Sequence, residues 1–211
     1  MIILLRIILF GLCLFYLSQQ SLASSCTYNT YSWNTTIREA VDHKTVNKPY
    51  DELIPAEVDA FTGCTVCEED QRTVSIPPIQ PFKICHIIAP GVEEILQSLV
   101  DRGEPIFSIT GYRVGNTRGV VDEKGNRTHF SNHSFGIAFD INADLNGLYD
   151  NCIAFSESCR LIKGGAWRPE QRGGLSIDSP LVRAFQSMGF KWGGQILGQQ
   201  KDFMHFSPTG Y

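Results

Sequence analysis

The number of cysteines limits what this chain can fold into, because seven of them occur in only 211 residues. The first, Cys13, lies in the apolar segment 2–16, which is followed by the small residues Ser21 and Ala23. A basic residue near the start, a short apolar segment and small residues at its end are typical of a secretory signal peptide. A membrane anchor is the alternative, but this segment is shorter than the roughly 20 apolar residues that span a bilayer. We therefore expect residues 1–23 to be a cleaved signal peptide. The rest of the chain would be periplasmic or secreted, with no stable membrane span.

Six cysteines remain after this cleavage, and an even number in an exported chain predicts disulfide bonds. The candidates are Cys26, Cys64, Cys67, Cys85, Cys152 and Cys159. Cys152 and Cys159 lie in one loop and are expected to pair with each other, whereas the connectivity of the other four stays open. The spacing of Cys64 and Cys67 also fits a zinc knuckle or a redox motif. However, the strand–helix context of a redox motif is missing here.

The composition indicates a globular domain without a strongly basic surface. Hydrophobic residues make up 43% of the chain and charged residues 19%, which excludes a disordered tail and a coiled coil. The formal net charge is -4, so no nucleic-acid partner is expected.

Two segments have the periodicity of amphipathic helices. Apolar side chains recur at helical spacing in residues 91–102, and residues 180–188 follow a helix start at Ser179-Pro180. A strand is expected over residues 106–112, and long loops separate the few other strands. We therefore predict an α+β fold in which a small antiparallel sheet packs against these two helices.

The part of the chain after the signal peptide divides into two predicted domains. Residues 24–89 form a cysteine-bearing N-terminal extension with few periodic stretches, and the proline-rich segment 76–81 suits neither a helix nor a central strand. Residues 90–211 form the second domain, which carries the recognisable chemistry.

The segment 131–140, with the sequence SNHSFGIAFD, brings a histidine and an aspartate close together. Phe139 and its apolar neighbours at alternate positions predict a strand, which turns Asp140 away from the core. Gly136 permits a sharp turn, so His133 folds back towards the strand that carries Asp140.

A similar arrangement recurs at residues 201–207, with the sequence KDFMHFS. Phe206 is expected to face the core and His205 the opposite side of a strand. Two histidines and one aspartate on polar strand faces suit a single catalytic zinc ion, which takes three protein ligands and keeps one position open for water. Asp202, three residues before His205, is then a candidate general base.

These two segments resemble the signature of a zinc peptidase superfamily, SxHxxGxAxD followed by (E/D)xxHF. Its members include D-alanyl-D-alanine carboxypeptidases, the L-alanyl-D-glutamate endopeptidases of phage lysins, lysostaphin-type enzymes and the hedgehog signalling domain. The sequence GYR at residues 111–113 resembles the arginine-bearing strand of this family. The sequence GFKWGG at residues 189–194 resembles the GFxWGG element of the endopeptidase branch. The resemblance extends over residues 90–208 and does not include residues 26–89.

The resemblance implies a role for five residues. His133, Asp140 and His205 would bind one zinc ion, Asp202 would be the catalytic carboxylate, and Arg113 would polarise the scissile carbonyl. It also implies a hedgehog-like and D-Ala-D-Ala-peptidase-like zinc site on the small antiparallel sheet.

Two positions depart from the family pattern. Many members have glutamate where Asp202 stands, so a shorter side chain must reach the same water. Ile196 replaces the second tryptophan of the WGGxW sequence that is common in the endopeptidase branch. The second departure leaves the choice of substrate open.

The function that the resemblance implies is an exported zinc metallopeptidase that hydrolyses peptidoglycan stem peptides by metal-activated water. Two bonds are candidates for the cleaved bond: the terminal D-Ala-D-Ala bond, which a carboxypeptidase cuts, and the L-Ala-D-Glu bond, which an endopeptidase cuts. The alternative is a non-catalytic, zinc-containing binding module similar to the hedgehog domain. Asp202 favours the enzyme, because a purely structural zinc site needs no carboxylate beside an open position.

Three further residues are candidates for substrate contact, namely Ser131, His129 and Trp192. The glycine-rich segment 164–174, which contains Trp167, is expected to be either a mobile cover over a cleft or an ordinary surface loop.

Overall fold

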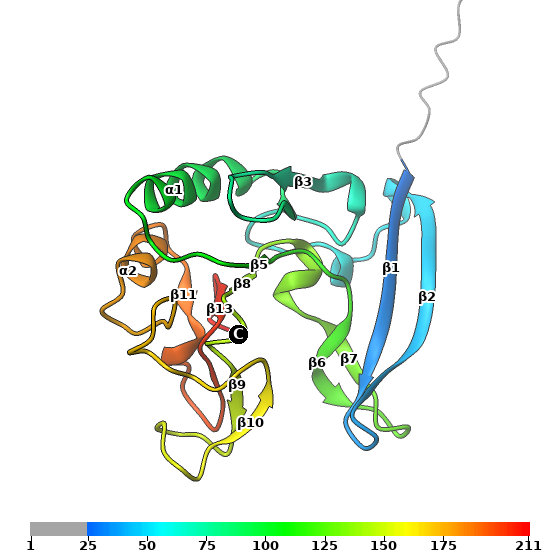
Figure 1. Ribbon diagram of the computed structural model, residues 1–211. Coiled ribbons are helices and arrows are strands. Elements are labelled where there is room, and N and C mark those ends of the chain that lie inside the picture. The colour runs from blue at the N-terminus through cyan, green and yellow to red at the C-terminus, as the bar shows by residue number, and fades with distance from the viewer. Residues whose placement is uncertain (1–24) are drawn as a thin grey trace, which may run out of the picture.

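The computed structural model describes residues 25–211, and its small antiparallel sheets and two α-helices confirm the predicted α+β fold (Figure 1). The expected signal peptide lies outside the described residues. Within residues 25–211, no helix has the length and apolar character needed to cross a membrane.

The central sheet is antiparallel throughout and has the strand order β11-β13-β8-β5. Its strands are β11 (Lys191–Trp192), β13 (His205–Ser207), β8 (Phe139–Ile141) and β5 (Ile109–Thr110). The strand predicted over residues 106–112 is therefore too long. The side-chain oxygen of Asn142 accepts hydrogen bonds from the backbone N–H groups of Phe107 and Ser108, which replace strand pairing there.

Both predicted helices are confirmed to within two residues at each end, as α1 (Ala89–Asp101) and α2 (Pro180–Ser187). Each has proline in its first turn, where the missing N–H would have no partner within the helix. Their apolar faces cover the central sheet: Phe185 of α2 packs against Phe139 of β8 with ring centroids 4.8 Å apart. This core holds one face of the sheet, so the opposite face is free to carry polar groups.

The N-terminal extension opens with a long hairpin of β1 (Ser25–Asn34) and β2 (Glu39–Pro49). Strand β1 also pairs in parallel with β6 (Asn116–Val121), which pairs with β7 (Arg127–Phe130). Figure 1 shows this sheet on one side of the molecule, across from α1, α2 and β10 (Arg160–Lys163).

A second hairpin of the extension, β3 (Gln71–Val74) with β4 (Phe82–Cys85), contributes to the main core. Val74 and Ile84 are fully buried in the same apolar cluster as the inner face of α1. The segments before residue 90 are thus packed into the structure that supports the central sheet.

The six cysteines form three disulfide bonds, which confirms the predicted candidates. The pairs are Cys26–Cys67, Cys64–Cys85 and Cys152–Cys159. The first two join β1 and β4 to the intervening loop, and the third is the predicted pair within one loop. That loop connects β9 (Leu148–Asp150) to β10, and β9 also pairs with β12 (Lys201–Asp202).

A buried carboxylate stabilises the extension. Glu57 accepts hydrogen bonds from the Tyr28 hydroxyl, from the ammonium group of Lys48 and from the backbone N–H of Ile54. Burial alone would raise the pKa of Glu57, but these donors and the charge of Lys48 lower it overall below its usual 4.5. Glu57 is therefore ionised and paired at neutral pH.

We expect Glu57→Gln to lower the free energy of unfolding at neutral pH by about 2 kcal/mol, because the buried charge-assisted bonds are lost. A carboxylate whose pKa is lowered on folding stabilises the folded state fully at pH values above its unfolded-state pKa. This stabilisation disappears as the pH falls through the folded-state pKa. Urea unfolding from about pH 7 to about pH 3 should therefore show the difference between wild type and variant shrinking below pH 4.5. A difference that is independent of pH would contradict an ionised Glu57.

Candidate metal centre

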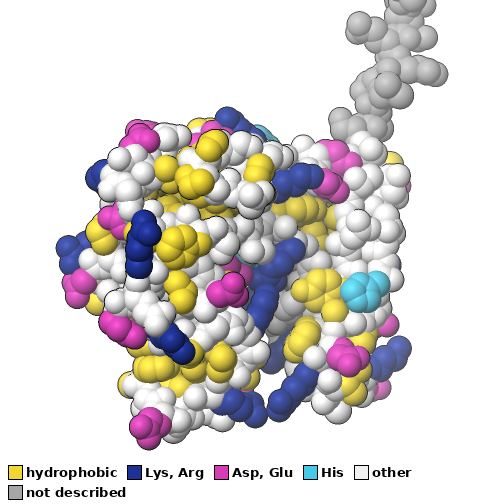
Figure 2. All heavy atoms as spheres, in the orientation of Figure 1, with side chains coloured by type: hydrophobic (Ala, Val, Ile, Leu, Met, Phe, Trp, Pro, Cys, Tyr) yellow, Lys and Arg dark blue, Asp and Glu magenta, His cyan; other side chains and the backbone are white. Residues whose placement is uncertain are grey.

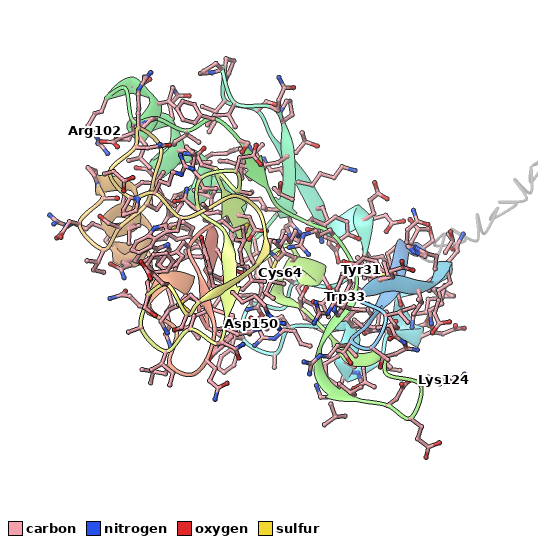
Figure 3. The ribbon with its side chains drawn as sticks, turned by 60° about the horizontal axis from the view of Figure 1, so that its bottom comes forward. Tyr31, Trp33, Cys64, Arg102, Lys124 and Asp150 are labelled. Carbon is pink, nitrogen blue, oxygen red and sulfur yellow. A yellow bond between two sulfur atoms is a disulfide. The ribbon has the colours of Figure 1, made fainter. Side chains whose placement is uncertain are left out.

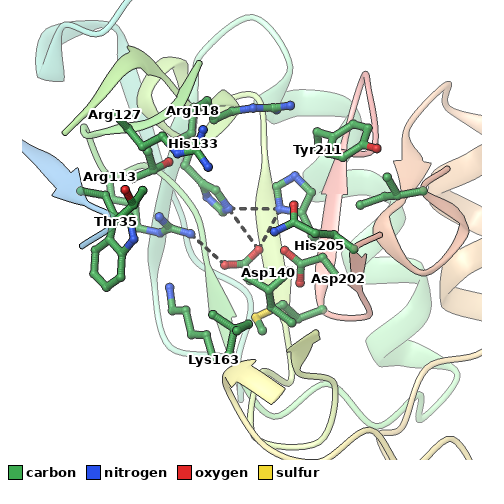
Figure 4. A pocket seen from close by; sticks show the side chains of 18 of the residues that line it. Thr35, Arg113, Arg118, Arg127, His133, Asp140, Lys163, Asp202, His205 and Tyr211 are labelled. Carbon is green, nitrogen blue, oxygen red and sulfur yellow. Dashed lines mark hydrogen bonds and ion pairs between the residues drawn. The ribbon is translucent and has the colours of Figure 1, made fainter. Parts of the chain in front are cut away.

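The three expected metal ligands converge on the polar face of the central sheet (Figure 4). His205 of β13 stands directly opposite Asp140 of β8, and His133 lies in the 3-10 helix Asn132–Phe135 that precedes β8. Asp140 Oδ1 is 3.0 Å from His133 Nε2 and 2.9 Å from His205 Nδ1. The two histidine nitrogens are 3.2 Å apart, and all three side chains are buried.

The hydrogen-bond partner of His133 defines which atom faces the other ligands. His133 Nδ1 lies 2.8 Å from the carbonyl oxygen of Gly111, which can only accept, so Nδ1 carries the hydrogen. Burial lowers the pKa of His133 to about 4, and its neutral ring therefore presents a lone pair at Nε2. This lone pair faces a carboxylate oxygen, and a cation bound between them would relieve their repulsion. A histidine fixed through its second nitrogen is also characteristic of zinc sites, and the cluster fits such a site.

The neighbouring groups in the cluster keep Asp140 ionised. Burial would raise the pKa of Asp140, but the neighbouring His133 and His205 lower it well below its usual range. Burial would lower the pKa of His205, but its hydrogen bond to Asp140 raises it overall. The carboxylate is therefore ionised and attracts positive charge to this position, as a divalent cation requires.

Glycine is required at two positions for the backbone to reach this geometry. Gly136 has a φ of +66°, and a Cβ there would lie 2.0 Å from Gln71 Oε1 and 2.5 Å from the backbone nitrogen of Cys85. At Gly111 a Cβ would lie 2.2 Å from the Lys83 carbonyl oxygen. Both glycines allow close contact with the β4 region, and this contact positions His133.

We expect Gly136→Ala to lower the free energy of unfolding by about 3 kcal/mol or more. The cost of a left-handed φ for alanine is added to the cost of the clash between its Cβ and the backbone. Gly103→Ala is the matched control, since Gly103 has a φ of +77° but no atom within 4 Å of the added Cβ. The control should lose only about 1–2 kcal/mol in urea unfolding. Equal losses in the two variants would show that the close packing around Gly136 is unimportant.

Asp202 lies beside the three ligands on β12 (Figure 4). Its Oδ1 is buried and has no hydrogen-bond partner among the described residues. Burial, together with the negative charge of Asp140, raises the pKa of Asp202 to about 7, although His205 and nearby cations oppose the shift. An unpartnered carboxylate oxygen next to a metal cluster can exchange a proton with a water or an amine.

The GFKWGG element holds Asp202 in place. The Trp192 indole donates a hydrogen bond of 2.8 Å to the carbonyl of Phe203, and a Cβ on Gly193 would lie 2.3 Å from the Asp202 carbonyl oxygen. This explains why tryptophan and glycine occupy these positions. The structure places Trp192 in the core, so the substrate contact suggested for it from the sequence is not supported.

Arg113 borders the cluster on the other side. Its guanidinium contacts Asp140 Oδ2 at 3.1 Å, and its backbone N–H donates to the His133 carbonyl. Its Nε is buried without a partner among the described residues. Arg113 therefore keeps a donor available beside the ligands.

A cavity of about 400 Å³ lies in front of the cluster. Figure 2 shows it as a groove between the two sides of the molecule, with Lys and Arg side chains along it. Ser131, one of the expected substrate contacts, lines this cavity. Within the described part of the chain, His129 is exposed outside the cavity lining. Trp167 stacks on Phe203 with ring centroids 3.8 Å apart, and this packing does not fit a mobile cover.

Several other residues that line the cavity are not marked by any local sequence pattern. They are Tyr31, Trp33, Arg118, Arg127 and Lys163. Their positions depend on the pairing of β1 with β6 and of β9 with β10, which no local pattern reveals.

The model of the family described as D-alanyl-D-alanine carboxypeptidase matches residues 124–208. The matched segment contains His133, Asp140, Asp202 and His205, whereas Arg113 precedes it. The predicted resemblance is confirmed over this part of the chain, and the match implies a metallopeptidase. Searches of curated proteins and of solved structures found no match.

Proposed function

We propose that this protein is an exported zinc metallopeptidase that hydrolyses a peptide bond in peptidoglycan stem peptides. One observation carries the proposal: Asp202, whose buried Oδ1 has no hydrogen-bond partner within residues 25–211, lies next to a His–Asp–His cluster at a cavity large enough for a peptide. The family match supports the peptidase chemistry and its substrate class. Three disulfide bonds are in keeping with an oxidising compartment outside the cytoplasm.

His133, Asp140 and His205 are the residues that would hold the zinc ion. A zinc ion in such a site lowers the pKa of water to about 7 and acts as a Lewis acid towards a carbonyl oxygen. The neutral ring of His133 and the ionised Asp140 are in the protonation states that metal ligands need.

Asp202 and Arg113 would carry out the remaining steps. Asp202 accepts a proton from the attacking water, whose oxygen bonds to the peptide carbonyl carbon. Arg113 donates a hydrogen bond to the carbonyl oxygen as negative charge develops there. When the C–N bond breaks, Asp202 passes the proton to the departing amine, so the carboxylate returns to its starting state.

The proposal is tested with a synthetic stem pentapeptide that contains both the L-Ala-D-Glu bond and the D-Ala-D-Ala bond. Mass analysis after incubation with zinc-loaded protein should show either the loss of one D-Ala or the release of L-Ala. Binding of the peptide without cleavage would favour the non-catalytic, hedgehog-like module.

A further inference from the structure

The N-terminal hairpin forms one wall of the cavity, although it lies outside the segment that matches the peptidase family. Tyr31 and Trp33 of β1 line the same cavity as the His–Asp–His cluster. Figure 3 shows both aromatic residues on the side of the hairpin that faces the centre of the molecule. Both are only half-buried, so part of each ring remains available to a ligand.

Several contacts fix this wall to the rest of the site. Ser32 of β1 pairs with Asn116 of β6, and the side-chain amide of Asn34 donates a 2.8 Å hydrogen bond to Asn126 Oδ1. A Cβ at Gly115 would lie 2.7 Å from the Tyr31 ring, so glycine there lets the ring rest on the backbone just before β6. These contacts hold the hairpin against β6 and against the turn before β7.

The same wall carries two cations without a carboxylate partner. Arg118 of β6 and Arg127 of β7 line the cavity, and neither has an ion-pair partner within residues 25–211. The Arg118 guanidinium lies over the Tyr211 ring at 5.1 Å, and Arg127 donates to the Gly119 carbonyl. In Figure 4 both arginines lie on the His133 side of the cluster.

The charges around the cavity favour an anionic ligand. Lys163 on β10 is a third cation without a carboxylate partner in the described chain, and it lies on the Asp140 side. The carboxylate side chains that line the cavity are those of Asp140, which contacts Arg113, and Asp202. Half-buried guanidinium groups beside aromatic rings bind a carboxylate well, because the rings reduce competition from water.

From these observations we infer that Tyr31, Trp33, Arg118 and Arg127 form a subsite that binds a free carboxylate of the substrate peptide, with its apolar flank on the aromatic rings. The inference rests on the proposed function and restricts its substrate to peptides that carry a free carboxylate. Both competing bonds lie next to such a group: the terminal D-Ala carries one carboxylate, and D-Glu, linked onward through its side chain, carries another. The part of the chain that precedes the family match thus takes part in substrate selection.

The test compares acid and amide forms of two probe peptides. One pair is acetyl-L-Lys-D-Ala-D-Ala and its C-terminal amide; the other is an L-Ala-D-Glu peptide and its D-isoglutamine form. Calorimetry measures their binding to the full, zinc-loaded chain carrying Asp202→Asn, with and without Arg118→Gln or Trp33→Ala. Arg102→Gln is the matched control, because Arg102 lies at the end of α1 and outside the cavity lining.

We expect the Asp202→Asn chain without a second substitution to bind the acid form of one peptide about 10- to 100-fold more tightly than its amide form. A charge-assisted hydrogen bond to the carboxylate would produce a difference of this size. Arg118→Gln should remove most of this difference, whereas Arg102→Gln should retain it. Trp33→Ala should weaken the acid and the amide alike, by about 10-fold. The pair that shows the preference identifies which of the two carboxylates is bound.

Two results would overturn the inference in distinguishable ways. If acid and amide bind equally, or if Arg118→Gln leaves the preference intact, the subsite is wrong but the proposed peptidase function stands. If none of the four peptides is bound and the wild-type chain cuts none of them, both the subsite and the proposed function fail.

Discussion

Replacing Asp202 by asparagine should leave the bound zinc in place and reduce kcat by about 100- to 10,000-fold, the contribution of a general acid–base group. Asparagine has nearly the same shape but cannot take a proton from water. The measurement combines zinc content by atomic absorption with steady-state hydrolysis of a stem peptide. Asp178→Asn serves as the control, because Asp178 is highly exposed and its ion pair with Arg183 should contribute little.

Two results would contradict the role assigned to Asp202. Full activity of the variant would show that another group moves the proton. Loss of zinc together with activity would instead make Asp202 a ligand, in disagreement with its place beside the His133, Asp140 and His205 cluster.

Removing a ligand should have a different effect from removing the base. His205→Ala is expected to lose both zinc and turnover, because two remaining ligands cannot hold the ion at the affinity of a three-residue site. Added zinc stabilises only a chain that binds it, so it should raise the Tm of the wild type and leave that of His205→Ala unchanged. His86→Ala is a suitable control, since His86 is exposed and outside the cavity. A variant that retains stoichiometric zinc would exclude His205 from the site.

The sequence was most informative where function depends on local patterns. Alternation of apolar and polar residues placed Asp140 and His205 on the polar faces of two strands. Their pairing across β8 and β13 is a finding of the structure. The helix at residues 91–102 was likewise visible from its periodicity. Each of these patterns arises from a buried face of a helix or strand, because every position on that face needs an apolar residue.

Features that depend on distant contacts could not be predicted in this way. The β1–β2 hairpin has polar residues on both faces, so its place beside β6 left no distinct pattern. The pairing of Cys26 with Cys67 is one of several connectivities that four cysteines allow. The strand expected over residues 106–112 was shortened by Asn142, whose side chain comes from another part of the chain.

The most direct test of the account is digestion of purified peptidoglycan by the zinc-loaded protein, with mass analysis of the fragments and Asp202→Asn as the inactive control. We predict that the wild type either removes the terminal D-Ala or cuts between L-Ala and D-Glu, and that the control does neither. Unchanged peptidoglycan after incubation with protein that carries one zinc ion per chain would contradict the account.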